Sequence, residues 1–202
     1  MKTTFRIFCA GLLMVCAAGC GKNPLLKAVT SDYAPLSVGD SWTYASPDGS
    51  KRVQVSVPGM ATVAGTACFR EQVVDQAGNS STQYVARNPD SLMAYDATLG
   101  TWYVDRRLPY VSGNRWNLPL AAGQLQDTRF VDGMENLGVP AGSFESCYKV
   151  RTLTVSQSAG VSSTATDLVW AAPDVGDIQM AHLDATGKVV VDYQLVQFHL
   201  VP

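Results

Sequence analysis

Only a few residues of this chain have the types and spacing that metal binding or acid–base chemistry requires. His182 and His199 are the two histidines, and they fall in separate predicted strands, away from any cysteine at zinc-ligand spacing. Asp174 and Asp177 could form a carboxylate pair or a cation site. Aspartate is routine in a turn before a strand, however, and this segment lacks the dense oxygen ligands of a calcium loop. We therefore expect no metal site and no cofactor.

Ser146 and Lys149 have the spacing of the serine-x-x-lysine signature of penicillin-recognising enzymes. That signature works on a helix, whereas this segment is predicted to be a strand, which turns the two side chains to opposite faces. No nucleophile elbow, nucleotide loop, redox cysteine pair or metalloprotease helix occurs in the sequence. We expect no enzyme, and a hydrolase whose catalytic groups lie outside short motifs is the remote alternative.

Five aromatic side chains could line a groove for an apolar ligand. They are Trp42, Phe69, Trp116, Tyr148 and Trp170. The more common role of such residues is the core of a sheet, because large aromatics supply much of the apolar burial of a domain. In a strongly curved sheet one residue can serve both roles.

The amino terminus predicts export and a lipid anchor. Lys2 and Arg6 precede an apolar stretch over 7–18 that is too short to span a bilayer. The segment "VCAAGC", which ends at Cys20, resembles the bacterial lipobox, whose cysteine receives diacylglycerol before cleavage. The alternative is ordinary signal cleavage beside an unmodified Cys20.

Acylation would make a membrane the first partner of the protein, since each buried methylene contributes ~0.8 kcal/mol. Gly21 follows the anchor cysteine. The resemblance to sorted lipoproteins implies delivery to the outer membrane, facing the periplasm, because aspartate at that position is the usual mark of inner-membrane retention.

The mature chain would hold 183 of the 202 residues, which fits a single domain. Loss of Lys2 and Arg6 leaves 13 of the 15 basic groups against 17 acidic ones, a balance of about −4. There is no basic run, so nucleic acid is not an expected partner.

Two cysteines remain once the signal has left and Cys20 is acylated, and we expect Cys68 and Cys147 to form a disulfide in an oxidising compartment. Such a bond would stabilise the fold by roughly 4 kcal/mol in the chain-entropy model. The alternative is two separate thiols. Strand alternation places each beside charged side chains, so separate thiols would be accessible and oxidisable.

The rest of the chain reads as short extended runs between turns. The clearest is 51–57, where valines alternate with polar residues, so one face is buried and one is wet. Further strands are predicted near 41–46, 66–75, 81–87, 91–96, 101–106, 126–132, 144–156, 163–171, 176–184 and 188–200. Helical turns are considered only at 24–30 and 118–126. The fold class is therefore all-β: a strongly curved antiparallel sheet or half-barrel of about ten strands.

The chain matches itself weakly at four places in the same order. The matched segments are 39–42 with 113–116, 64–70 with 141–149, 89–90 with 173–174, and 96–98 with 184–186. This order favours an internal duplication, with chance as the alternative because Gly, Ala and Asp are common here. Cys68 and Cys147 would be equivalent positions, able to meet near a pseudo-two-fold axis.

These observations give a division of the chain. We expect residues 1–19 to be the signal peptide, 20–35 a lipid-anchored tether, and 36–202 one β domain built of two repeats, about 36–110 and 111–202.

Three segments carry a family resemblance. "YAPLSVGDSWTY" (33–44), "LGVPAGSFESCYKV" (137–150) and "VWAAPDVGDIQM" (169–180) resemble recurring features of uncharacterised bacterial envelope lipoproteins. Such proteins are more distantly similar to the half-barrel of the outer-membrane lipoprotein carriers. The resemblance implies a fold with an apolar concave face and implies no activity.

Three functions follow in order of preference. The first is a non-catalytic lipoprotein that binds an apolar ligand, a lipid or a lipoprotein segment. The second is a scaffold or accessory subunit of a cell-envelope complex, which binds protein through a polar face or an edge strand. The third is a hydrolase. The run 188–200 is apolar on both faces, which favours an interior strand.

Overall fold

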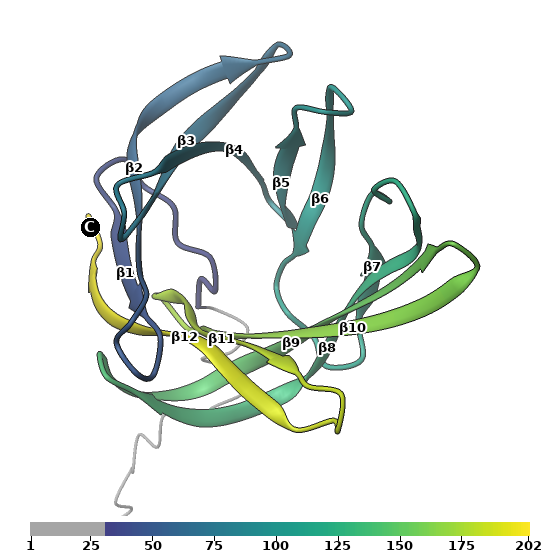
Figure 1. The fold of residues 1–202 in the computed structure, drawn as a ribbon. Coiled ribbons are helices and arrows are strands. Elements are labelled where there is room, and N and C mark those ends of the chain that lie inside the picture. Colours follow the sequence, from purple (N-terminus) through teal and green to yellow (C-terminus); the bar gives the residue numbers. More distant parts are fainter. Residues whose placement is uncertain (1–30) are drawn as a thin grey trace, which may run out of the picture.

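The computed structural model describes residues 31–202, and every regular element in that range is a β-strand (Figure 1). The strands are β1 (Ser41–Ala45), β2 (Arg52–Val63), β3 (Thr66–Asp75), β4 (Ser80–Asn88), β5 (Ser91–Asp96), β6 (Thr101–Arg107), β7 (Arg115–Asn117), β8 (Gln124–Val139), β9 (Gly142–Ser158), β10 (Val161–Ala172), β11 (Gly176–Leu183) and β12 (Val189–His199). No helix that could cross a membrane lies in this part of the chain.

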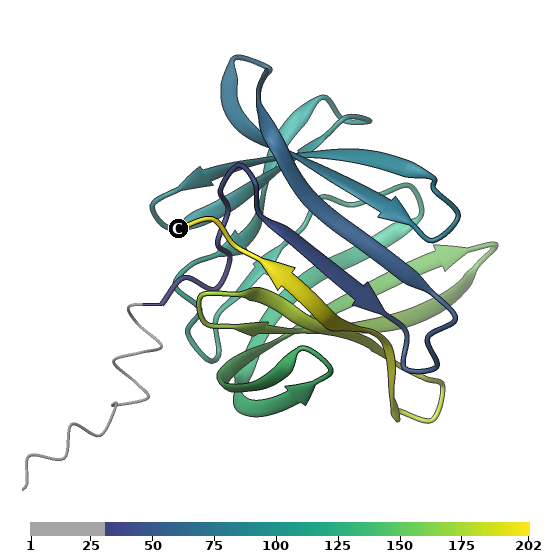
Figure 2. The same cartoon turned by 90° about the vertical axis from the view of Figure 1, so that its left-hand side faces the viewer.

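The twelve strands form one antiparallel sheet in the order β6-β5-β4-β3-β2-β1-β12-β11-β10-β9-β8-β7. The first and last strands of the chain pair at its centre, and β6 and β7, which are consecutive in sequence, are its two edges. Figures 1 and 2 show the sheet curling into a nearly closed barrel. The predicted class of a strongly curved all-β sheet is confirmed, with twelve strands rather than about ten.

Local sequence explains the individual strands. In β2 Arg52 and Gln54 are exposed, whereas Val53 and Val55 are partly buried and Val57 is buried, as the alternation predicts. The turn before β2 closes with a 2.8 Å hydrogen bond from the amide of Gly49 to the carbonyl of Ser46. Glycine suits this site because its φ is +72°.

Most of the buried apolar side chains form two clusters. One contains Tyr33, Tyr110, Trp116, Val131, Tyr148, Val150 and Ala171. The larger one includes Trp42, Tyr44, Cys147, Leu168, Trp170, Ile178 and Leu195. Both faces of the sheet are thus covered along part of β9 and β10, because neighbouring residues of each strand belong to different clusters.

The tip of the β8–β9 hairpin packs against β12. The amide of Ala141, in the turn of that hairpin, donates a 3.0 Å hydrogen bond to the carbonyl of Leu195 in β12. Leu195 is fully buried, and β12 lies between β1 and β11. The prediction that 188–200 forms an interior strand is therefore confirmed.

Matched hydrogen bonds recur in the two halves of the chain. The amide of Gly39 donates to the carbonyl of Val57 over 2.8 Å, and Gly113 donates to Val131 over the same distance. Val57 and Val131 in turn donate to the residues that follow these glycines, both over 2.9 Å. The turns at Asp96 and Asp184 also match, since each aspartate side chain accepts from an amide two residues later.

These bonds support the duplication hypothesis, because each falls at a place where the sequence matches itself. β1–β6 make up one half of the sheet order and β7–β12 the other. The repeat boundaries stay a prediction. The folded part begins before residue 36, since Tyr33 and Ala34 are already buried.

Some sequence expectations differ from the structure. The three-residue strand β7 was not predicted, because so short a run carries no periodicity. The helical turn considered at 118–126 does not form: residues 118–123 are loop and turn, and β8 begins at Gln124. The helical turn considered at 24–30, the signal peptide and Cys20 lie outside the described residues.

No disulfide joins Cys68 to Cys147 in the described residues. Five strands lie between β3 and β9 in the sheet order, whereas disulfide bonding requires Cα atoms within about 7 Å. The expectation of exposed thiols is also wrong, since the two side chains are 1% and 0% exposed. For Cys147 the reason is that both faces of β9 are covered: Tyr148 is buried in the opposite cluster.

Candidate ligand-binding site

The interior of the curved sheet holds a cavity of about 220 Å³. Its wall is formed by β1–β6, by the start of β11 and by the segment that leads into β1. The lining residues are Ala34, Pro35, Leu36, Trp42, Tyr44, Val55, Glu71, Val73, Gln83, Leu92, Arg106, Gly176, Asp177 and Met180. Most of these side chains are apolar, and the charged ones are a small set, as in many sites for small molecules.

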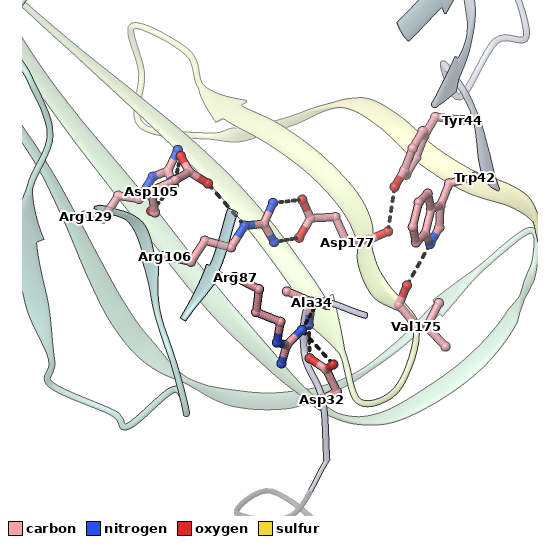
Figure 3. Close-up of polar contacts among 10 residues, drawn as sticks. All are labelled: Asp32, Ala34, Trp42, Tyr44, Arg87, Asp105, Arg106, Arg129, Val175 and Asp177. Atoms are coloured by element: carbon pink, nitrogen blue, oxygen red, sulfur yellow. Dashed lines mark hydrogen bonds and ion pairs between the residues drawn. The ribbon is translucent and has the colours of Figure 1, made fainter. Parts of the chain in front are cut away.

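Two aromatic residues of β1 fix one wall of the cavity against the β10–β11 turn (Figure 3). The indole nitrogen of Trp42 donates a 2.7 Å hydrogen bond to the carbonyl of Val175. The hydroxyl of Tyr44 donates a 3.1 Å bond to the carbonyl of Asp177. Both side chains are buried, so these bonds satisfy their polar atoms and hold the rings in place. Burial and the nearby Asp177 raise the pKa of Tyr44 well above its usual value.

A line of charged side chains crosses the interior (Figure 3). Arg106 on β6 binds both carboxylate oxygens of Asp177, over 2.6 and 2.7 Å. Its Nε lies 3.4 Å from the carboxylate of Asp105, which also accepts a 2.8 Å bond from Arg129 on β8. Burial, the largest single effect, lowers the pKa of Arg106, but Asp177, Tyr110 and Asp105 together outweigh it and the net direction is upward. The bidentate pair therefore links strand β6 to β11.

Glu71 on β3 is the remaining acidic group of the wall. No residue from 31 to 202 donates a hydrogen bond to its carboxyl. Burial raises its pKa to about 7; Arg106 lowers this pKa, while Asp177 and Asp105 add to the increase. The cavity wall thus includes a carboxyl group that titrates near neutral pH, is attracted by Arg106 and accepts no hydrogen bond from the described residues.

The five aromatic groove candidates separate in the structure. Trp42 lines the cavity, and the other four do not. Trp116 and Tyr148 are packed in the cluster with Tyr33 and Tyr110, and the Trp116 indole donates a 3.0 Å bond to the carbonyl of Asp105. Trp170 is buried in the other cluster with its indole on Glu135, and Phe69 packs at the edge of that cluster.

Sequence reasoning missed Glu71 and Arg106 as site residues. Glu71 has the same strand parity as the groove candidate Phe69, two residues before it, so a signal existed in an otherwise apolar face. Arg106 carried no such signal, because its partner Asp177 is 71 residues away in sequence. Asp177 was interpreted as turn chemistry, and the structure instead places its side chain in the interior ion pair.

The other polar candidates have structural partners outside the cavity. Asp174 lies in the turn between β10 and β11 with a φ of +61°, and its side chain accepts a 2.9 Å bond from the amide of Asp32, which ties that turn to the segment before β1. His182 lies 2.8 Å from a carboxylate oxygen of Asp192 on the surface. Within residues 31–202 no group of His, Cys, Asp and Glu side chains is arranged to hold a metal ion.

The sequence matches no family model and no curated protein. Two solved structures match in three dimensions. A "putative lipoprotein" from Parabacteroides distasonis gives a TM-score of 0.54 at 13% identity, over 84% of this chain and 99% of that one. A "putative exported protein with YmcC-like fold" from Bacteroides fragilis gives 0.51 at 15% identity, over 84% of this chain and 100% of that one. This chain shares their fold. Likeness at these identities says nothing of ligand or activity.

Proposed function

We propose that this chain is an exported, lipid-anchored protein without catalytic activity whose domain binds an apolar ligand, or an apolar segment of a lipid or lipoprotein, in the interior cavity. The observation that carries the proposal is the cavity itself, whose wall is mainly apolar and is held by the hydrogen-bonded Trp42 and Tyr44. Binding would be driven by burial of the apolar surface of the ligand, which contributes a free energy of about 25 cal/mol for each square ångström removed from water.

The size of the cavity limits the ligand. About 220 Å³ lies below the range of roughly 300–1,000 Å³ that is typical for sites of drug-sized molecules. We therefore expect a small amphiphile, or one end of a longer chain.

The anchor is the second part of the proposal. Acylation of Cys20, at the end of the lipobox-like segment, would tie the domain to the outer membrane on its periplasmic side. The names of the two similar structures, one called a lipoprotein and the other an exported protein, support a location in the cell envelope.

The cavity can be tested by filling it. The protein used is the mature chain, residues 20–202, secreted with a cleavable signal and carrying Cys20→Ser. Calorimetric titration with decanol should show saturable binding, weakened at least tenfold by Met180→Trp, which puts an indole where a lining side chain stands. Met134→Trp is the matched control, since Met134 is exposed and lies outside the wall. No binding, or equal binding by all three proteins, would contradict the proposal.

One observation favours the second candidate, an accessory subunit of an envelope complex. β6 and β7 are the two edges of the sheet and offer backbone groups to a strand of another protein. This function predicts that another protein copurifies with the anchored chain in a fixed ratio. A proline substitution in β6, which removes a backbone N–H from that edge, should abolish the copurification.

A further inference from the structure

We propose, resting on the function above, that the cavity selects amphiphiles with a cationic head, such as a primary ammonium group, and that this head pairs with Glu71. The proposal names the ligand class by its chemistry: a short apolar chain that ends in a positive charge.

The first support is the position of Glu71. Its side chain belongs to the cavity wall, together with Val55, Val73 and Met180, and it accepts no hydrogen bond from any residue between 31 and 202. Glu71 is partly buried, and a partly buried carboxylate that accepts no hydrogen bond is less stable than one with a hydrogen-bond partner. A ligand that brings one positive charge would supply that partner beside an apolar wall.

The second support is the charge balance of the interior. Three carboxyl groups, those of Glu71, Asp105 and Asp177, face two guanidinium groups, those of Arg106 and Arg129. Arg106 and Arg129 are committed to Asp177 and Asp105, so the excess is one acidic group. That group is Glu71.

The same pairing disfavours an anionic ligand such as a fatty acid. Arg106 is the cation of the cavity wall, and both of its terminal nitrogens already bind the carboxylate of Asp177. A ligand carboxylate would have to displace that bidentate pair and would then stand near Glu71. Repulsion between the two carboxylates would weaken its binding.

The pairing also predicts a pH dependence. The groups that face Glu71 are Tyr44 on β1, Asp105 and Arg106 on β6, and Asp177 on β11. With a pKa of about 7, Glu71 is charged at pH 8 and mostly neutral at pH 6. A protonated carboxyl cannot form an ion pair with an ammonium group, so protons and the cationic ligand compete for one site.

The experiment compares three probes of equal chain length, decylamine, decanoate and decanol, by calorimetry below their micelle concentrations. The protein is again the mature chain with Cys20→Ser. At pH 8 decylamine should bind at least tenfold more tightly than decanoate. Glu71→Gln should weaken decylamine binding at least tenfold, a much larger loss than it causes for decanol, which carries no charge. Glu145→Gln, the same change at an exposed glutamate, should bind as the parent chain does.

The unsubstituted site provides a measurement that needs no variant. Decylamine stays protonated at pH 6 and pH 8, yet its affinity should fall about tenfold at the lower pH because Glu71 is then neutral. Equal affinity at both pH values, or no difference between decylamine and decanoate, would overturn this inference. Decanol separates the two proposals: if it binds without a preference for the amine, only the cationic head is wrong, and if no probe binds, both are wrong.

Discussion

Arg106 and Asp177 form the main polar contact across the interior. The two side chains are 23% and 14% exposed, and they join β6, an edge of the sheet, to β11 near its centre. Removal of one member of a largely buried pair leaves the other charge without its partner, which costs more than the pair contributes in net stability.

Asp177→Ala should therefore destabilise the protein by about 2–4 kcal/mol, because Arg106 loses its bidentate partner and keeps the longer contact with Asp105. The control is Asp132→Ala, which breaks a more exposed pair with Arg151 and should cost about 0–1 kcal/mol. Denaturation in urea gives both values. Equal losses in the two variants would show that the interior pair is no stronger than a surface one.

Glu71 should make stability depend on pH in a stated direction. Its pKa is about 7 in the folded chain, against 4.5 for an ordinary glutamate, so the folded state binds the proton more tightly than the unfolded state. The free energy of unfolding should accordingly fall as the pH rises from about 4 to 8, by up to about 3 kcal/mol in total.

Glu71→Gln removes this titration and should be more stable than the parent chain at pH 8. The difference between the two proteins should shrink as the pH falls towards 5. Urea denaturation at several pH values measures this difference, and other titrating groups cancel because both proteins share them. A difference that stays constant with pH would contradict the account of Glu71.

At the level of elements, the order of the sheet predicts how firmly each strand is held. β12 is paired on both sides, to β1 and β11, and carries the fully buried Leu195. β7 is three residues long and pairs only with β8. Backbone amides should exchange with solvent most slowly in β12 and, among the strands, fastest in β7.

Hydrogen–deuterium exchange followed by mass spectrometry tests this order. If β6 and β7 are as well protected as β12, the two edges must be paired, either with each other or with another chain. That outcome would contradict the edge assignment and would favour the accessory-subunit candidate.

Strands could be predicted where local chemistry decides them. β3 and β5 have the predicted limits of 66–75 and 91–96, because an alternating or apolar run ends there at turn residues. β7 could not be predicted, since three residues are too few to show an alternation of apolar and polar side chains. β8 continues to Val139, beyond its predicted end at 132, because the register shifts after Val131 and Glu135 interrupt the alternation there.

The site was harder to predict than the strands. Trp42 could be proposed from its type and its place in a strand. The ion pair of Arg106 with Asp177 depends on how two distant strands meet inside the curled sheet, which periodicity does not encode. The cysteine pairing failed for the same reason, since Cys68 and Cys147 match in sequence while their strands lie far apart in the sheet.

At the scale of the whole molecule, the chain forms a single curled sheet (Figure 1). β1 and β12, the first and last strands of the chain, pair at its centre, and β6 and β7 are its two edges. This arrangement leaves a cavity with a mainly apolar wall inside a domain that we propose is held at a membrane. Position and cavity together lead to the central claim, which is that the domain binds an apolar ligand there.

The most direct test of that claim is native mass spectrometry of the mature chain with Cys20→Ser, secreted into the periplasm and sprayed under gentle conditions. We expect a fraction of the protein to carry one additional mass of the size of a small amphiphile, which organic extraction releases. Met180→Trp should lose that mass while its fold, followed by circular dichroism, is kept. Only the mass of the bare chain, or an additional mass that persists in Met180→Trp, would contradict binding in the cavity.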